Sequence, residues 1–196
     1  MSDRPAYRVS SVRAMLAELD RQFPDAARRL RDEIPSEVFV SVRDALSLTW
    51  LDAVVHHQIA DWIYRALGAD DYRVLWRHAF LEMVRLPLFR PMTEGAIRLF
   101  GATPASLARW TARGYTLATR DLGTMTLVVD DAAERRLVID VDGYPPALAA
   151  SGSNVVATAG SFDGYLDLTG VTGEVTVTAN EPERGFARYQ IRWNQR

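Results

Sequence analysis

The chain has no cysteine, and it has no lysine either, so all 23 of its basic residues are arginines. Without cysteine there can be no disulfide, no thiolate nucleophile and no cysteine-ligated zinc or iron–sulfur cluster. Without lysine there can be no Schiff-base residue, no phosphate-loop lysine and no Ser–Lys catalytic pair. The bias toward arginine is typical of a GC-rich genome, and it carries no functional argument here.

Long apolar runs are also missing. No stretch approaches the roughly 18 consecutive apolar residues that a membrane-spanning helix needs. The net charge is −2, which provides no overall positive field to attract nucleic acid. Since no disulfide framework points to secretion, we expect a cytoplasmic protein that neither spans a membrane nor binds nucleic acid.

The spacing of apolar residues changes near Gly123, from helical before it to alternating after it. Helices are expected over 9–20, 25–34, 48–67, 70–84, 91–101 and 103–114, and one more over 155–166. Strands are expected over 124–129, 136–141, 175–179 and 187–193. The pattern predicts a single α+β domain over 1–196, with a helical layer at 1–121 and a sheet portion at 122–196. In that portion two hairpins flank a helix and form a four-stranded antiparallel sheet, which the N-terminal helices cover.

The expected helix over 155–166 contains Gly160 and Gly164, four residues apart. A phosphate-binding loop would need a following lysine, which this chain lacks. The two glycines are therefore predicted to allow close packing against another element.

The three histidines, His56, His57 and His78, are the candidates for base catalysis or haem ligation. On a helical projection His57 falls with Asp61 and Arg65, away from the apolar stripe, and His56 lies at the border of that stripe. Such neighbours are typical of surface pairs, so we predict solvated or border positions for all three histidines. The pair His57 and Asp61 could orient an imidazole for base catalysis, but no nucleophile is visibly paired with it.

No metal site is expected. His56 and His57 are adjacent and point about 100° apart on a regular helix, so they cannot both face one ion. The segment from Asp140 to Gly143 resembles the start of a calcium loop, but the twelfth position is Ser151 rather than a glutamate. We therefore assign no catalytic and no metal-binding residue.

Large apolar side chains are concentrated in the expected helices. They fit either a filled core or an apolar cavity between the helices and the sheet, and the sequence does not separate the two. The candidate ligand-binding residues are Trp62, Trp76, Phe80, Met83, Trp110, Tyr115 and Phe162.

This plan, with its closing strand Tyr189-Gln190-Ile191-Arg192-Trp193, resembles one known superfamily. That superfamily contains the haem–nitric-oxide/oxygen-binding (H-NOX) sensors, the four-vinyl-reductase-type ligand-binding domains and a Golgi-tethering subunit family. Within it the chain is most similar to a bacterial family of paralogues restricted to the Myxococcales, through residues 38–48, the region from Phe80 to Pro87 and the closing strand. The resemblance implies a pocket or partner surface, self-association and no enzymatic activity.

The chain departs from the pattern of the haem sensors. These proteins carry a histidine on a helix in the middle of the chain and a Tyr-x-Ser-x-Arg motif for the haem propionates. Residues 87–110 contain no histidine, and neither 115–119 nor 189–192 matches the motif. Haem is therefore disfavoured, and no cofactor is expected. The metal-binding cysteines found in four-vinyl-reductase-type domains are missing too.

Three functions remain open. The first is a non-enzymatic sensory or regulatory domain that binds a small apolar ligand. The second is a protein–protein interaction or scaffolding module acting as a homodimer, which predicts exposed apolar patches on the helical layer. The third is an enzyme that uses His57 with Asp61, or Asp140 with Asp142.

Overall fold

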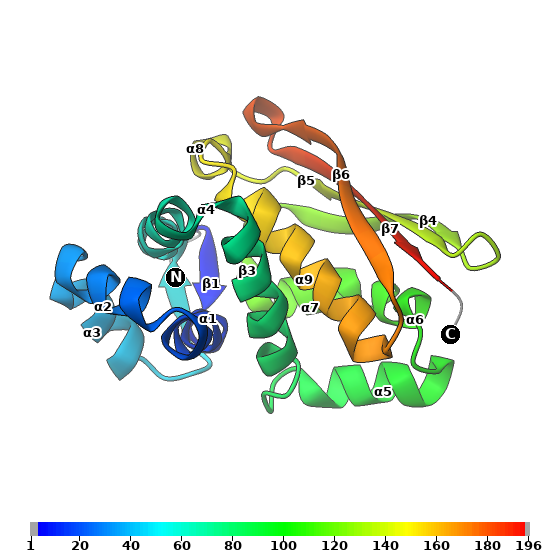
Figure 1. Cartoon of the computed structure of the whole chain (residues 1–196), viewed down its shortest axis with the longest axis horizontal. Coiled ribbons are helices and arrows are strands. Elements are labelled where there is room, and N and C mark those ends of the chain that lie inside the picture. The colour runs from blue at the N-terminus through cyan, green and yellow to red at the C-terminus, as the bar shows by residue number, and fades with distance from the viewer. Residues whose placement is uncertain (1–3, 195–196) are drawn as a thin grey trace.

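The computed structural model describes residues 4–194, so the predicted domain boundaries at 1 and 196 fall outside the described residues. The mixed α+β class predicted from the sequence is confirmed (Figure 1). The helices are α1 (Val9–Gln22), α2 (Pro24–Glu33), α3 (Ser36–Asp44), α4 (Ala53–Met83), α5 (Arg90–Phe100), α6 (Pro104–Ala108), α7 (Thr111–Ala118), α8 (Pro146–Ala149) and α9 (Ser153–Thr169). The strands are β1 (Ala6–Arg8), β2 (Trp50–Asp52), β3 (Thr119–Arg120), β4 (Thr124–Asp131), β5 (Arg136–Asp142), β6 (Gly173–Glu181) and β7 (Phe186–Trp193).

Helix α4 joins the two helices that the apolar spacing predicts on either side of Gly68. Gly68 itself is not helical, with φ 78° and ψ 174°, and it kinks α4 at that point. The helix begins at Ala53 rather than at residue 48, because residues 50–52 form β2 and pair with β1. Asp52 caps the first turn, where its side chain accepts a hydrogen bond from the Val54 backbone N–H at 2.8 Å.

The C-terminal sheet has the strand order β4-β5-β7-β6, with every neighbouring pair antiparallel. Both predicted hairpins are present, and the pairing of β5 with β7 joins them. Ile139 lies opposite Tyr189 at the centre of this pairing, and both side chains are almost completely buried. The described 3-10 turn η1 (Pro182–Arg184) connects β6 to β7.

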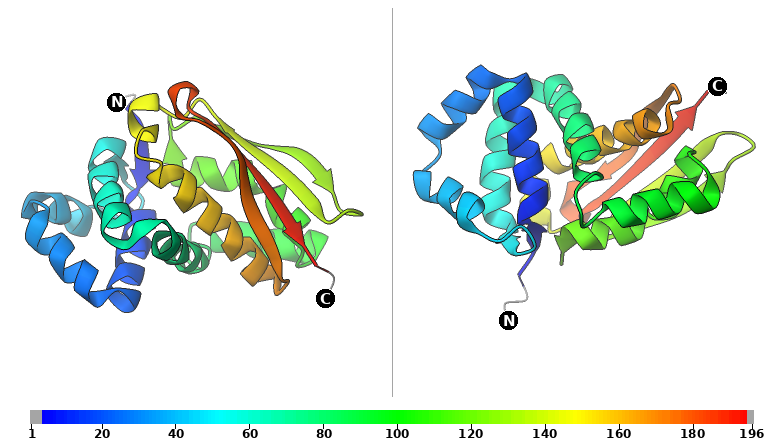
Figure 2. Two further views of the ribbon diagram at one scale, coloured as in Figure 1. Left: turned by 45° about the horizontal axis from the view of Figure 1, so that its top comes forward. Right: turned by 90° about the horizontal axis from the view of Figure 1, so that it is seen from below.

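Helix α9 packs on β6 and β7, and α7 packs on β4, so these two helices line the inner face of the sheet (Figure 2). Helices α1 and α2 pack against α4, and α3 packs against α1, away from the sheet. The apolar core accordingly has two clusters, one between the sheet and α9 and one between α1, α2 and α4. Helix α4 therefore lies between the N-terminal helices and α9, and it is buried on two sides.

A second, small antiparallel sheet has the order β2-β1-β3. Its strands are two or three residues long, too short to produce an alternating pattern, and the sequence did not indicate them. This sheet ties the beginning of the chain to the starts of α4 and β4. It therefore brings Tyr7 next to α4.

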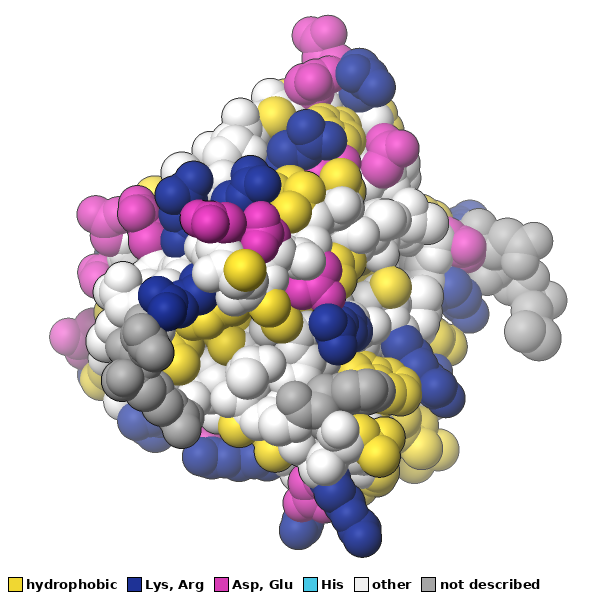
Figure 3. Space-filling model, turned by 90° about the vertical axis from the view of Figure 1, so that its right-hand side faces the viewer, with side chains coloured by type: hydrophobic (Ala, Val, Ile, Leu, Met, Phe, Trp, Pro, Cys, Tyr) yellow, Lys and Arg dark blue, Asp and Glu magenta, His cyan; other side chains and the backbone are white. Residues whose placement is uncertain are grey.

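The face in Figure 3 shows apolar side chains interspersed with arginine and acidic side chains rather than gathered into one continuous patch. Within residues 4–194, no helix combines the length and the apolar character needed to cross a bilayer.

Helices α4 and α9 pack closely against each other, and this contact joins the N-terminal half of the fold (α1 to α4) to the half formed by α9 and the sheet. A Cβ on Gly160 would collide with the Arg73 carbonyl oxygen, and one on Gly164 would lie 2.5 Å from Phe80 Cδ1. The close packing predicted from these glycines is therefore confirmed. Alongside it, the Arg73 guanidinium binds the Asp163 carboxylate in a bidentate pair at 2.6 and 3.0 Å.

We expect Gly160→Ala to destabilise the protein by about 1–3 kcal/mol, because the added methyl group forces α4 and α9 apart. Gly95→Ala in α5 is the matched control, since a Cβ there meets nothing within 4 Å. That control should be neutral or stabilising by about 0.5–1 kcal/mol, because alanine favours the helix. Urea unfolding monitored by circular dichroism measures both changes. Equal effects of the two substitutions would contradict the close contact.

Candidate ligand cavity

A cavity of about 180 Å³ lies where α4, α7, α9 and the sheet meet. Its lining is mostly apolar and aromatic, with side chains from both core clusters. Six of the seven ligand-binding candidates predicted from the sequence line it, although they come from separate helices. These six are Trp76, Phe80, Met83, Trp110, Tyr115 and Phe162.

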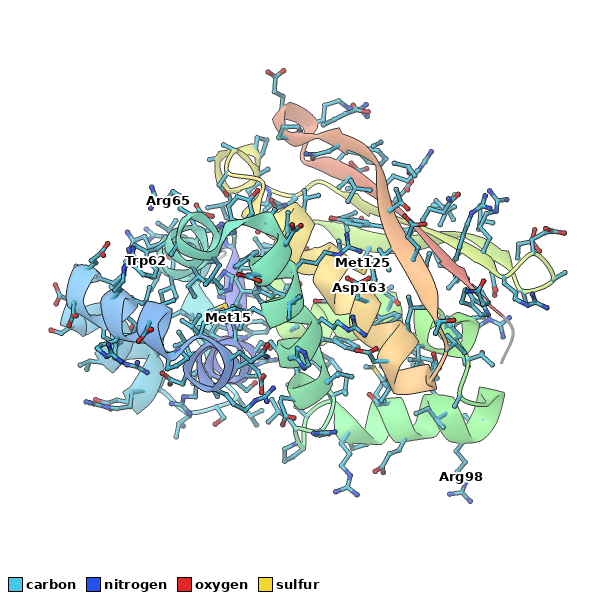
Figure 4. The ribbon with its side chains drawn as sticks, in the orientation of Figure 1. Met15, Trp62, Arg65, Arg98, Met125 and Asp163 are labelled. Atoms are coloured by element: carbon cyan, nitrogen blue, oxygen red, sulfur yellow. The ribbon has the colours of Figure 1, made fainter. Side chains whose placement is uncertain are left out.

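Trp62, the seventh candidate, does not line the cavity. Its side chain belongs to the cluster between α1, α2 and α4. There its indole N–H donates a hydrogen bond to Glu33 Oε2 at 2.8 Å. Figure 4 shows Trp62 on the side of the N-terminal helices, whereas Met125, which lines the cavity, lies on the side of the sheet.

A chain of hydrogen bonds runs along one wall of the cavity. The Tyr7 and Tyr144 hydroxyls are 2.7 Å apart, and the Tyr144 hydroxyl lies 2.5 Å from His57 Nε2. All three residues line the cavity. They come from β1, from the segment after β5 and from α4, so this chain connects the two halves of the fold.

Gly185 packs against the Tyr144 backbone and fixes its position. It adopts the left-handed conformation with φ 64°, and a Cβ there would collide with the Tyr144 backbone. The Tyr144 N–H also donates to the Gly185 carbonyl at 3.0 Å. Only glycine fits this contact, which fixes where the Tyr144 side chain begins.

Asp61 lies one helical turn beyond His57. Its Oδ1 accepts hydrogen bonds from Ser151 Oγ at 2.7 Å and from Ser153 Oγ at 2.5 Å, and it lies 3.7 Å from His57 Nδ1. Burial alone would raise the pKa of Asp61, but its interactions with His57 and the two serines outweigh burial and lower the pKa to about 2. Asp61 is therefore ionised, and it joins the start of α9 to α4.

His56 is buried without any hydrogen bond. It is 3% exposed, and neither ring nitrogen has a partner within the described residues. Its ring stacks on Tyr7 with the centroids 3.8 Å apart and meets the edge of Trp76 at 6.2 Å. Burial, followed by the neighbouring His57, lowers the pKa of His56 to about 3. The imidazole is therefore neutral.

The prediction that His56 and His57 are solvated or at a border is wrong, because they are only 3% and 4% exposed. A helical projection assumes one buried stripe, but α4 packs against α1 on one side and α9 on another. The face of α4 that carries these two histidines is therefore buried as well. His78, farther along α4, is half-buried and lies outside the cavity.

The groups around His57 are linked to one another by hydrogen bonds. Burial is the main cause that raises the pKa of Tyr144 far above its usual value, so its hydroxyl stays protonated. Tyr144 is also the one side chain bonded to the His57 ring among the described residues. The other acidic candidate, Asp140, is engaged by Arg188 in a bidentate pair at 2.7 and 2.8 Å.

Several solved structures that resemble this chain are H-NOX domains. The Fe(II) unliganded H-NOX protein from K. algicida has a TM-score of 0.65 at 10% identity, over 96% of this chain and 97% of that one. An oxygen-binding H-NOX domain related to soluble guanylate cyclases, in its oxygen complex, has a TM-score of 0.61 at 12% identity, over 96% and 95%. A structure from work on heme distortion in the H-NOX family has a TM-score of 0.63 at 12% identity, over 96% and 95%.

The chain therefore has the H-NOX fold, which confirms the predicted resemblance at the level of the fold. No family model matches the chain, and neither does any curated protein. Because identities of 10–12% establish the fold alone, the cavity itself has to indicate what it can bind.

The residues of the cavity do not fit haem. No arginine is present among the described lining residues to pair with propionates, and α5 contains no histidine. His57 Nε2 is engaged by Tyr144, and one face of His56 is covered by Tyr7. The volume of about 180 Å³ is also below the roughly 300–1,000 Å³ of pockets for drug-sized ligands, so it is too small for a porphyrin.

Among the polar residues of the cavity wall, sequence reasoning did not predict Tyr7 and Tyr144, nor the buried positions of His56 and His57. The two tyrosines are 137 positions apart, so no spacing rule links them. A usable signal was the pair of adjacent histidines within a helix that is otherwise rich in apolar residues.

The adjacent histidines offer a matched test of this wall. We expect His57→Phe to lower the free energy of unfolding by about 1–3 kcal/mol, because the substitution removes a buried partner of Tyr144. His56→Phe should be neutral or stabilising, since it removes two unpaired polar atoms and a phenyl ring keeps the stacking on Tyr7. Urea unfolding measures the change in the free energy of unfolding for both variants. A larger loss for His56→Phe than for His57→Phe would be inconsistent with these contacts.

Proposed function

We propose that this protein is a non-enzymatic sensory domain that binds a small, mainly apolar ligand in the cavity between α4, α9 and the sheet. The observation that carries the proposal is the cavity itself, at the junction of the two core clusters of an H-NOX fold. A ligand there contacts both halves of the protein at once. Its binding can therefore change how they pack, which is what a sensory domain requires.

The absence of enzymatic activity is part of the proposal. It is supported by the two groups that the His57 ring faces, the protonated hydroxyl of Tyr144 and the ionised carboxylate of Asp61. A proton-transfer site needs a group whose pKa lies near the working pH. Neither Tyr144, with its strongly raised pKa, nor Asp61, with a pKa of about 2, meets this need.

A homodimeric interaction module is the second candidate. It is favoured by exposed apolar side chains near the segment between α3 and β2, where Leu46 is 76% and Leu48 is 61% exposed, with Val40 exposed nearby on α3. Contiguous exposed apolar patches are typical of protein–protein contacts, and these three residues lie close together in the sequence.

Several finer expectations accompany the proposal. They are a regulatory role in the cytoplasm, one domain over 1–196, and membership of the bacterial, Myxococcales-restricted family of paralogues. The H-NOX fold is compatible with each of them. They remain predictions.

The proposal is tested on protein purified from its own host. We expect solvent extraction followed by gas chromatography–mass spectrometry to recover one small organic compound in a reproducible amount. Ala157→Leu should abolish its retention, because Ala157 lines the cavity and the larger side chain occupies the space. Ala112→Leu is the control, since Ala112 is exposed and lies outside the cavity.

Three results would count against the proposal. A Soret band in the absorbance spectrum would show haem in the protein. The recovery of no compound, together with no rise in melting temperature in benzene or toluene, would indicate a solid core. A native mass of twice the chain without any bound compound would instead favour the homodimeric module.

A further inference from the structure

We propose that the ligand is a compact, uncharged molecule with one hydroxyl or amide group, and that His56 recognises this group by a hydrogen bond. The inference rests on the proposed function and adds the chemical class of the ligand. It starts from the contrast between two adjacent histidines in the same cavity wall.

The first observation is that the His56 ring is positioned entirely by packing. Tyr7 covers one face with the ring planes 26° apart, and Trp76 meets the ring at 64°. Neither Nδ1 nor Nε2 has a hydrogen-bond partner within the described residues. In contrast, the Nε2 of His57 is engaged by Tyr144 at 2.5 Å. The protein thus uses one histidine for its own structure and leaves the polar atoms of the other free.

An unpaired polar atom in the interior has a cost. A buried donor or acceptor without a partner destabilises a protein by about 1–3 kcal/mol, and most such groups in folded proteins are paired. His56 is 3% exposed and lines the cavity, so a partner can reach its ring from the cavity. A ligand that supplies the missing hydrogen bond to His56 removes this free-energy cost when it binds.

The second observation concerns charge. Burial lowers the pKa of His56 to about 3, so at neutral pH the ring has one donor and one acceptor and no charge. The chain has no lysine, and no arginine occurs among the described residues of the lining. A carboxylate or phosphate would be buried here without a counter-charge, which is strongly unfavourable. The cavity therefore suits an uncharged ligand.

Four more polar atoms of the lining residues are buried without a hydrogen-bond partner among the described residues: Ser11 Oγ, His57 Nδ1, Trp76 Nε1 and Asn154 Oδ1. A hydroxyl both donates and accepts, and so does an amide, so either can satisfy an imidazole together with one of these atoms. A purely apolar ligand would leave all of them unpaired. We therefore expect the cavity to bind the proposed class of ligand more tightly than a simple hydrocarbon of the same size.

The third observation is size. A cavity of about 150 Å³ lined by apolar side chains is able to hold benzene, and this one measures about 180 Å³. The available space therefore corresponds to one six-membered ring with a single small substituent. The ring would lie against the apolar part of the lining, which includes Phe80, Leu107 and Phe162.

The test uses two pairs of probes that differ by a hydroxyl in place of a methyl group: phenol with toluene, and cyclohexanol with methylcyclohexane. Isothermal titration calorimetry gives the affinity of each probe for the full chain. We expect each alcohol to bind at least tenfold more tightly than its methyl counterpart, which corresponds to about 1.4 kcal/mol. His56→Phe should reduce this preference to within twofold.

His78→Phe is the matched control, because His78 lies on the same helix but outside the cavity. It should keep the preference of the wild-type protein. If the methyl compounds bind as tightly as the alcohols, the inference is overturned while the proposed apolar site stands. A preference that survives in His56→Phe excludes His56 as the recognising residue. If none of the four probes binds, the proposed function fails and this inference fails with it.

Discussion

The close contact between α4 and α9 is the constraint on which the rest of the structure depends. It requires Gly160 and Gly164, because a Cβ at either position would meet α4. The Arg73–Asp163 and Arg77–Asp167 ion pairs hold the same two helices together. Since α4 belongs to the N-terminal cluster and α9 packs on the sheet, this contact joins the two cores and leaves the cavity where they meet.

Burial of α4 on two sides also explains the two histidines. Successive residues on a helix point about 100° apart, so His57 reaches Tyr144 while His56 stacks on Tyr7 beside the cavity. The same fold occurs in proteins described as oxygen-binding and as Fe(II) H-NOX proteins. Here it contains a cavity of about 180 Å³, with no arginine among the described residues of the lining. Fold and ligand are thus separable, and the ligand follows from the side chains of the cavity.

The sequence predicted the parts of the structure that depend on local pattern. Both hairpins and the close packing at Gly160 are examples. The sequence left open whether residues such as Phe80 and Phe162 fill a core or line a cavity. It did not predict β1, β2 and β3, because strands of two or three residues show no periodicity. It misplaced His56 and His57, because burial on a second face of α4 depends on a partner, α9, that begins almost 100 residues later. The hydrogen bond between Tyr7 and Tyr144 was also beyond prediction, because it joins residues that are 137 positions apart in the sequence.

A crystal structure of the protein as isolated from its host tests the central claim most directly. The account predicts electron density for one small non-protein molecule between α4, α9 and the sheet. One end of that molecule should lie within hydrogen-bond distance of a His56 ring nitrogen, and the rest should lie against Phe80 and Phe162. A repacked core, in which these side chains fill the space and His56 bonds to protein atoms, would contradict the account.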